Sequence, residues 1–409
     1  MKRGILMSCL AIIMACASCV KKDSLKVIDK EIRYVKDGIT TVPRPAPIPV
    51  QSRLDIPALP STNFEVPYPW KTENLSSSTN PNFAYKEPDK PWIVQLAISS
   101  RYTFDTREGA QDYKAWYRVS NDDGKTWPEL KPVIKQGQGF DLMKPVPGVV
   151  IGKNSFCPAG TSPILRASNG EIMVPFYSWP LDEKGELYDP YKANTYTVAG
   201  VLIGKWTTDG KDMLWDSSQT VDLDVKAATR GADEPTIIEL KKKGSFVMVI
   251  RGSNERCPDK AKMPGRRWVA FSKDYCRTWT KPEPMTYTDG ELFYSPSSSS
   301  IIIRSVLNQK VYWIGNISRT NTDGNSPRYP LIIGEVDEAK GALIKGTIIS
   351  IDDINPRYDS EKIQLSNFQA YQDPRTGNIL VVLCRLDFDW WLETSKKPVN
   401  WYLISVPVK

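Results

Sequence analysis

The sequence predicts an all-β fold built from four-stranded antiparallel sheets. One segment type recurs along the chain: a polar approach, a turn that usually contains Gly, and an apolar run rich in β-branched and aromatic residues. These turns fall at Gly170, Gly244, Asn308 and Gly377, which lie 64 to 74 residues apart, and Trp92–Ile98 starts an earlier member. Repetition on this period, with no long amphipathic helix between the strands, is typical of β-propeller blades. A pair of β-sandwiches is the alternative architecture.

The N-terminus is typical of an exported protein. Lys2 and Arg3 precede an apolar run that is too short to span a bilayer. Small residues then lead into Cys16 and again into Cys19, and both stretches are similar to the lipobox of bacterial lipoproteins, in which the cysteine is lipidated. We therefore expect residues 1–19 to be a lipoprotein signal peptide, with an ordinary secretory signal as the alternative. A lipid anchor would place the protein in the bacterial cell envelope, on the outer membrane or facing the periplasm.

Residues 20–70 are rich in Pro, Lys and Ser, and Pro43–Pro49 alternates Pro with other residues. Such a composition favours extended polyproline geometry, so we expect a Pro-rich tether between a membrane and the body. The body, residues 71–409, is then one propeller domain.

Composition excludes several function classes. The chain has no histidine, which removes Ser-His-Asp and Cys-His triads, His-ligated zinc and every histidine general base. Its net charge is +7, but the basic residues are scattered, so we expect no nucleic acid partner. A mild positive surplus suits an anionic substrate or surface. The sequence predicts no cofactor and no metal site.

Four cysteines lie in the body: Cys157, Cys257, Cys276 and Cys384. Their spacing matches no zinc pattern, and export makes disulfides possible. Cys257 and Cys276 are the first candidates for a pair, with free buried thiols as the alternative.

A second repeat is more specific. Ser120–Trp127 reads Ser-Asn-Asp-Asp-Gly-Lys-Thr-Trp, Ser272–Trp279 has the same pattern with Cys276 in place of Gly, and Thr207–Trp215 is a looser third copy. Asp and Gly favour a hairpin turn between outer strands, with Trp packed beneath it. The pattern resembles the Asp-box of sialidases and related proteins. This resemblance implies a six-bladed, sialidase-like β-propeller.

The resemblance extends to candidate site residues. Sialidases bind a sugar carboxylate with three arginines, and they use an Asp as acid/base and a Glu-activated Tyr as nucleophile. The loop Arg107–Asp112 is similar to the family's Arg-then-Asp loop, which makes Asp112 the acid/base candidate and Arg107 its neighbour. Glu234, before one strand, and Arg251, at the end of the next, match the activating Glu and a carboxylate-binding arginine. Arg328 matches the last arginine.

Two positions depart from the family's pattern. The first arginine is matched only by Lys86, a point charge without the guanidinium fork. At the nucleophile strand, Ser366, Asn367 or Phe368 stands where Tyr is expected, and Tyr371 and Tyr358 are out of register.

The sequence therefore predicts an exo-acting glycoside hydrolase of the sialidase type, which releases a terminal, acidic sugar from a glycan. Without a nucleophile we expect inversion at the anomeric carbon, with Asp112 as acid and Glu234 as base. A non-catalytic glycan-binding lipoprotein is the main alternative, and a polysaccharide lyase is a third. Trp179, Trp390 and Trp391 are candidates for sugar stacking.

Overall fold

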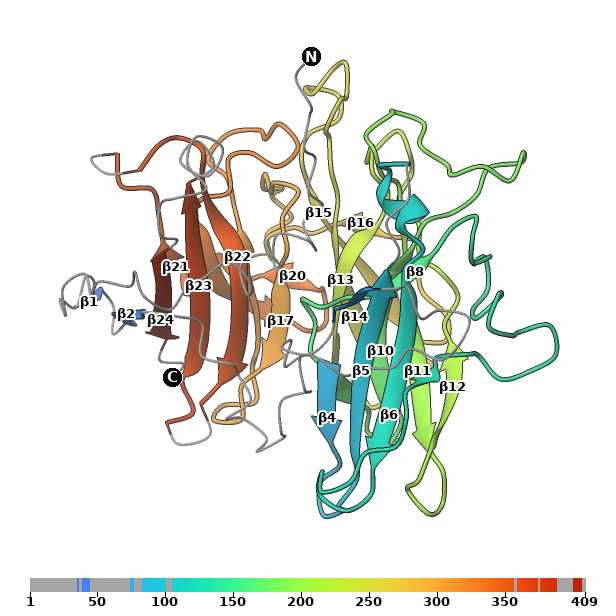
Figure 1. Cartoon of the computed structure of the whole chain (residues 1–409). Coiled ribbons are helices and arrows are strands. Elements are labelled where there is room, and N and C mark those ends of the chain that lie inside the picture. Colours follow the sequence, from blue (N-terminus) through green and yellow to red (C-terminus); the bar gives the residue numbers. More distant parts are fainter. Residues whose placement is uncertain are drawn as a thin grey trace, which may run out of the picture. The chain divides into compact units, whose positions relative to one another are not determined.

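The computed structural model describes residues 35–36, 39–44, 74–76, 83–100, 105–356, 359–373, 376–387 and 400–406. The chain divides into two compact units. Unit 1 comprises Met1–Pro47, Arg251–Val269 and Glu283–Lys409, and unit 2 comprises Ile48–Ile250 and Ala270–Pro282. Most of the regular structure is antiparallel strand (Figure 1), as the sequence predicts.

Two sheets belong to unit 2. The first has the strand order β3-β5-β6-β7 with β4 also paired to β5, and the second has the order β12-β11-β10-β8 with β9 also paired to β10. Their bounds are β3 Asn74–Ser76, β4 Ala84–Lys86, β5 Ile93–Ser100, β6 Lys114–Ser120, β7 Lys131–Pro132, β8 Phe156–Pro158, β9 Leu165–Arg166, β10 Ile172–Ser178, β11 Val198–Trp206 and β12 Met213–Ser217. Every residue of β10 is buried, which explains its unbroken apolar run.

The third sheet has the order β13-β14-β15-β16. Its bounds are β13 Asp233–Glu239, β14 Phe246–Arg251, β15 Arg267–Ser272 and β16 Glu283–Pro284. Strand β14 consists of five apolar residues followed by Arg251, and all six are buried. A buried charge needs polar partners, so we expect polar groups around the side chain of Arg251 at the end of β14.

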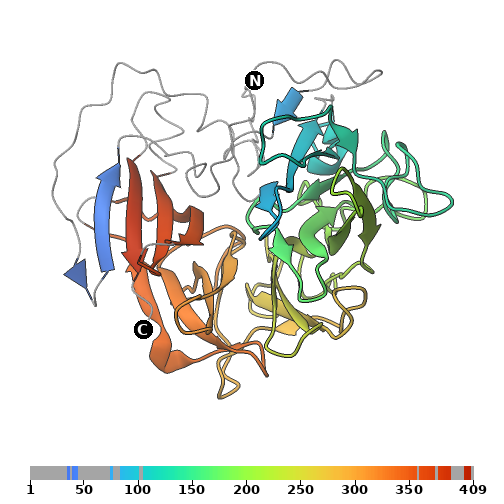
Figure 2. The ribbon, with the colours of Figure 1, turned by 90° about the horizontal axis from the view of Figure 1, so that it is seen from below.

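Two further sheets belong to unit 1. One has the order β17-β18-β19-β20 with β21 also paired to β19, and the other has the order β1-β2-β24-β23-β22. Their bounds are β17 Ile301–Arg304, β18 Val311–Asn316, β19 Leu331–Asp337, β20 Ala342–Leu343, β21 Ile349–Asp352, β1 Val35–Lys36, β2 Ile39–Arg44, β22 Ile363–Gln372, β23 Ile379–Asp387 and β24 Asn400–Val406. Strands β1 and β2 lie within the segment that the sequence predicts as a tether, and β2 runs beside β24 (Figure 2).

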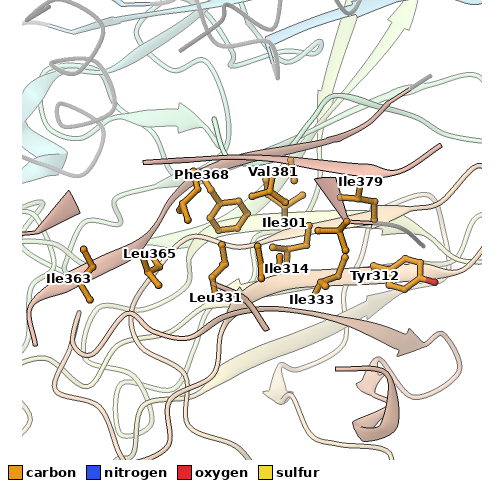
Figure 3. Close-up of a cluster of buried hydrophobic side chains, with 14 residues drawn as sticks. Ile301, Tyr312, Ile314, Leu331, Ile333, Ile363, Leu365, Phe368, Ile379 and Val381 are labelled. Atoms are coloured by element: carbon orange, nitrogen blue, oxygen red, sulfur yellow. The ribbon is translucent and has the colours of Figure 1, made fainter. Parts of the chain in front are cut away.

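One apolar cluster joins the two sheets of unit 1 (Figure 3). It contains Ile314 of β18, Leu331 and Ile333 of β19, Phe368 of β22 and Val381 of β23. Burying one such side chain contributes about 1.5–3 kcal/mol. The cluster therefore fixes β22 against β18 and β19, and with it the polar residues that precede Phe368.

The turns predicted from the repeat are confirmed. Gly170 lies between β9 and β10, Gly244 between β13 and β14, Asn308 between β17 and β18, and Gly377 between β22 and β23, and each pair of strands is hydrogen-bonded. The described residues form five sheets. A sixth blade stays a prediction.

The turn in Ser120–Trp127 is built by three side chains. Oγ of Ser120 donates to Oδ1 of Asp122 at 2.7 Å and accepts the N–H of Gly124 at 2.8 Å. The carboxylate of Asp122 also accepts the N–H and the hydroxyl of Thr126, at 3.0 and 2.6 Å. Gly124 has φ 81°, a conformation that glycine adopts without cost.

The turn in Ser272–Trp279 repeats this geometry without glycine. Ser272 donates to Asp274 at 2.8 Å and accepts the N–H of Cys276 at 3.0 Å. Asp274 accepts the N–H and hydroxyl of Thr278 at 2.9 and 2.6 Å. Cys276 has φ 67°, which is costly for a residue with a β-carbon.

The expectation of a disulfide between Cys257 and Cys276 is wrong. Cys157, Cys257 and Cys276 are free thiols, and Cys157, Cys276 and Cys384 are buried. Cys276 is completely buried, and its N–H donates to Oγ of Ser272 at 3.0 Å within its own turn, whereas Sγ of Cys257 donates to the backbone O of Asp259 at 3.3 Å.

Candidate functional site

Asp112 lies at the end of the short helix η3 (Glu108–Gln111) in unit 2. Its backbone is left-handed, with φ 58°, and the residue is buried. Oδ1 accepts the backbone N–H of Gly152 at 2.9 Å, and Nζ of Lys114 lies 3.6 Å from Oδ2. The amide of Gly152 and the ammonium group of Lys114 thus help to hold the predicted acid/base carboxylate.

Glu234 is the second residue of β13 and is also buried. Its φ of 39° is unusual for a residue with a long side chain, and its N–H donates to Oδ1 of Asp233 at 2.9 Å. Gly231, just before the strand, has φ 66°, and a β-carbon there would lie 2.1 Å from the backbone O of Thr197. Backbone strain of this kind costs about 1–3 kcal/mol and persists where the surroundings enforce it, as they often do at functional sites.

Tyr177 lies buried near the end of β10, and no motif in the sequence marks it as a site residue. Burial raises the pKa of its phenol well above the usual value, and electrostatic interactions with Cys157, Asp233, Glu234 and Glu108 raise it further. The phenol therefore stays protonated at physiological pH and supplies no phenolate. We call Glu108, Asp233 and Glu234 the acidic cluster, because all three act on this one side chain.

The thiol of Cys157 responds to the same charges. Burial raises its pKa to about 12, and Asp233, Glu108 and Glu234 contribute. Cys157 lies directly opposite Tyr177 in the pairing of β8 with β10. At neutral pH this pair is uncharged, which lets it pack beside the carboxylates.

Two arginines accompany the carboxylates of unit 2. Nη2 of Arg230 lies 3.6 Å from Oε1 of Glu108. Arg107, which we expected beside Asp112, pairs with Asp105: its Nε donates to both carboxylate oxygens at 3.1 and 3.0 Å, and its Nη2 donates to Oδ2 at 2.6 Å. These hydrogen bonds lower the pKa of Asp105. The guanidinium of Arg107 is thus directed to a carboxylate of its own loop.

Arg251 and Arg328 share one partner within unit 1. Nε of Arg251 donates to Oγ of Ser297 at 2.8 Å, and Nη2 of Arg328 donates to the backbone O of Ser297 at 2.7 Å. Nη2 of Arg251 also donates to Oδ1 of Asn325 at 3.4 Å. The two residues are only 2% and 5% exposed. We call them the arginine pair; two of the predicted carboxylate-binding arginines thus meet at one serine.

Strand β22 presents Ser366 to this pair. Nη1 of Arg328 donates to Oγ of Ser366 at 3.2 Å and to Oε1 of Gln364 at 2.9 Å. Phe368 belongs to the apolar cluster, and Asn367 is half-buried. Of the three residues that the sequence offers at the nucleophile position, Ser366 is the one hydrogen-bonded to a candidate arginine.

Of the two alternative tyrosines, Tyr371 lies among the described residues. Tyr371 is half-buried and alternates with Phe368 along β22, so it faces the other side of the strand. Tyr358 lies outside the described residues.

The structure describes Lys86 and one of the three candidate sugar-stacking tryptophans. Nζ of Lys86 lies 2.7 Å from Oδ1 of Asp123, so this lysine pairs with the turn that follows β6. Trp179 is 3% exposed, stacks on Tyr113 and donates Nε1–H to Thr195, so it is a core residue and no sugar platform. Trp390 and Trp391 lie outside the described residues.

The predicted lipidation sites, Cys16 and Cys19, also lie outside the described residues. Where the chain is described, no helix is long and apolar enough to cross a membrane. Nor do the described side chains contain a group of three or more Cys, Asp or Glu residues that could hold a metal ion.

No protein-family model and no curated protein matches the chain. Solved structures of sialidases are similar to it. NanB sialidase from Streptococcus pneumoniae is 16% identical, with a TM-score of 0.45 over 72% of this chain and 36% of that one. Trypanosoma rangeli sialidase in complex with sialic acid is 12% identical, with a TM-score of 0.45 over 82% of this chain and 45% of that one. The chain thus matches less than half the length of these sialidases.

Proposed function

We propose that this chain is an exo-acting glycoside hydrolase of the sialidase type, which releases a terminal acidic sugar from a glycan. The observation that carries the proposal is the arginine pair. Two buried guanidinium groups converge on Ser297, and a guanidinium fork binds a carboxylate bidentately and stays charged at every physiological pH. Positive charge concentrated in this way favours an anionic group on the ligand.

The carboxylates of unit 2 supply the chemistry in this proposal. Asp112 is the general acid that protonates the leaving oxygen, and Glu234 is the general base that activates water. Both residues are buried on left-handed backbone, which is where a protein stores strain to hold a reacting group in place.

A specific observation favours inversion at the anomeric carbon. The strand expected to carry a nucleophile presents Ser366, and Ser366 hydrogen-bonds to Arg328. Two carboxylates without a nucleophile fit direct attack by water. Proton NMR of the first-formed anomer tests this mechanism, and a retained anomer would mean that another residue attacks the sugar.

The central test is Glu234→Gln, with Glu239→Gln on the same strand as the control. We expect Glu234→Gln to abolish release of an acidic sugar from a glycan panel and to leave the melting temperature nearly unchanged. Glu239 is bonded to Ser168 and Gly244 at the surface turn, so its substitution should leave turnover at the wild-type level. Wild-type activity in Glu234→Gln would remove Glu234 from the mechanism.

The second candidate function is glycan binding without hydrolysis. The absence of tyrosine from positions 366–368 and the pairing of Lys86 with Asp123 favour it. The same glycan panel discriminates the two functions when binding and sugar release are both scored. Binding without release by the wild-type protein would select the second function.

We also propose that the sheets are blades of a six-bladed propeller and that Cys19 or Cys16 carries a lipid anchor in the bacterial cell envelope. The leader and its two lipobox-like stretches support the anchor. Metabolic labelling with a fatty acid, compared between wild type and Cys19→Ala and Cys16→Ala, tests it. A protein that takes up no label would exclude the anchor.

A further inference from the structure

Two loops of unit 1 hold the arginine pair. The first, residues 252–266, follows Arg251 and connects β14 to β15. The second, residues 317–330, connects β18 to β19 and contains Arg328. How these loops are fixed to each other therefore decides where the two guanidinium groups lie.

Asn254 of the first loop is completely buried and bonds to the second loop through both ends of its amide. Nδ2 donates to the backbone O of Thr322 at 2.8 Å, and Oδ1 accepts the backbone N–H of Gly324 at 2.8 Å. One side chain thus occupies a donor and an acceptor of the second loop. Losing such a bond leaves a buried donor or acceptor without its partner, which destabilises the arrangement of the two loops.

Asn321 provides a similar bridge from the opposite direction. Its Nδ2 donates to the backbone O of Lys260 at 2.8 Å, and its Oδ1 accepts the N–H of Gly265 at 3.0 Å. Lys260 also forms an ion pair with Asp323. The loops approach so closely at Gly265 that a β-carbon there would lie 1.9 Å from Oγ1 of Thr322.

The bridge at Asn254 leads directly to the arginine pair. The backbone O of Gly324 accepts the N–H of Ser297 at 2.8 Å, so both sides of Gly324 are fixed. Ser297 in turn accepts from Arg251 and Arg328. The next residue, Asn325, accepts from Arg251. Displacing Gly324 would therefore move the groups that orient both guanidiniums.

We infer that Asn254 is a positioning residue for the arginine pair. It acts through Gly324, and it sets the geometry in which the two guanidinium groups meet an anionic sugar. The inference rests on the proposed function for the identity of the ligand, but the placement of Arg251 can be measured without any ligand.

The first experiment reads that placement directly. In protein labelled with ¹⁵N-arginine, the Nε–H of Arg251 should give an exchange-protected NMR signal, assigned by its loss in Arg251→Ala. We expect Asn254→Ala to abolish the protection. Asn254→Asp should abolish it at about pH 7.5, because a carboxylate cannot donate a hydrogen bond to Thr322. Burial raises the pKa of such a carboxyl group, which makes protonation accessible at mildly acidic pH. At about pH 5 the protonated acid donates again and protection should return.

The second experiment measures affinity for N-acetylneuraminic acid in the same variants by calorimetry. We expect Asn254→Ala to weaken binding at least about tenfold, and Asn254→Asp to recover on acidification relative to wild type at each pH. An unchanged Arg251 signal in Asn254→Ala overturns the inference. So does full sugar affinity in Asn254→Ala when Arg251→Ala has lost it. If the sugar binds equally to every variant, including Arg251→Ala, the proposed function fails while the placement of Arg251 by Asn254 is still decided by NMR.

Discussion

The candidate carboxylates and the arginine pair are positioned by different parts of the structure. Asp112 and Glu234 lie on left-handed backbone, with φ 58° and 39°. Arg251 ends an ordinary extended strand, and its guanidinium is held by the side chains of Ser297 and Asn325. An unusual main-chain conformation therefore positions the carboxylates, whereas hydrogen bonds from neighbouring side chains position Arg251.

The two groups are therefore sensitive to different kinds of substitution. A strained backbone costs about 1–3 kcal/mol per residue, so the carboxylates are positioned at the expense of stability. A buried guanidinium is stable only while its hydrogen-bond partners remain, so the arginines are positioned by neighbours that can each be removed. In the proposed function, the carboxylates should govern turnover and the arginines should govern affinity.

The largest expected effect is that of Asp112→Asn. The amide oxygen can still accept the N–H of Gly152, but the general acid is gone, so we expect kcat to fall about 10²- to 10⁴-fold with KM little changed. The matched control is Asp182→Asn, because Asp182 also accepts backbone N–H groups, those of Lys184 and Glu186. Equal kcat values for wild type and Asp112→Asn would end the assignment of Asp112.

Arg328→Lys should have the next largest effect. A lysine keeps the charge but cannot reach Gln364, Ser366 and the carbonyl of Ser297 together. We expect affinity for an acidic sugar to fall about 10- to 100-fold, with a smaller change in kcat. Arg304→Lys serves as the control, because Arg304 lies in the same unit but outside the two loops that hold the arginine pair, where it pairs with Glu338. A loss confined to kcat would contradict the division of roles.

Alkaline pH should separate the two regions. The pKa of Tyr177 is raised in the folded state above its unfolded value of 10.0, so its contribution to stability is complete below about pH 10 and is lost as pH rises further. Above about pH 10, ionisation of Tyr177 should lower the free energy of unfolding by about 1.4 kcal/mol for each further pH unit. Tyr177→Phe should flatten the dependence in urea unfolding. An unchanged slope would mean that burial and the acidic cluster do not raise the pKa of Tyr177 in the folded state.

The smallest effect tests the backbone difference itself. At position 234 we expect the free energy of unfolding of Glu234→Gly to exceed that of Glu234→Ala by about 1 kcal/mol, because glycine adopts positive φ without strain. At position 251 the order should reverse, since the strand is extended there. Denaturant unfolding of the four variants measures both differences, and the same order at both positions would erase the contrast.

Much of the fold could be predicted because turns and apolar runs are local signals. Gly170, Gly244, Asn308 and Gly377 each mark the connection between two paired strands, as their repeat predicts. The number of blades is a different matter, because it depends on how strands from distant segments pair. Strand β2 pairs with β24, although the two strands are more than 300 residues apart in the sequence, and no local sequence pattern predicts this pairing.

The candidate site was predictable in part for the same reason. Arg251 could be assigned to a strand end from its apolar run, and β14 does end there. Trp179 was misassigned because a polar sequence context does not reveal that Tyr113 covers its ring. Tyr177 was missed because its neighbours Glu108 and Glu234 are distant in sequence, although its position at the end of a buried strand resembles that of Arg251.

The turn around Cys276 bears on how such sequences are recognised. Its hydrogen bonds reproduce those around Gly124, although the residue in the left-handed position carries a thiol. Ser, Asp and Thr therefore specify this turn strongly enough to tolerate an unfavourable residue at its tightest point. A pattern search that demands glycine would detect the turn at Ser120 and overlook the one at Ser272. Weighting the three hydroxyl and carboxylate positions above the glycine would recover both, and would extend detection to distant sequences in which the glycine has been lost.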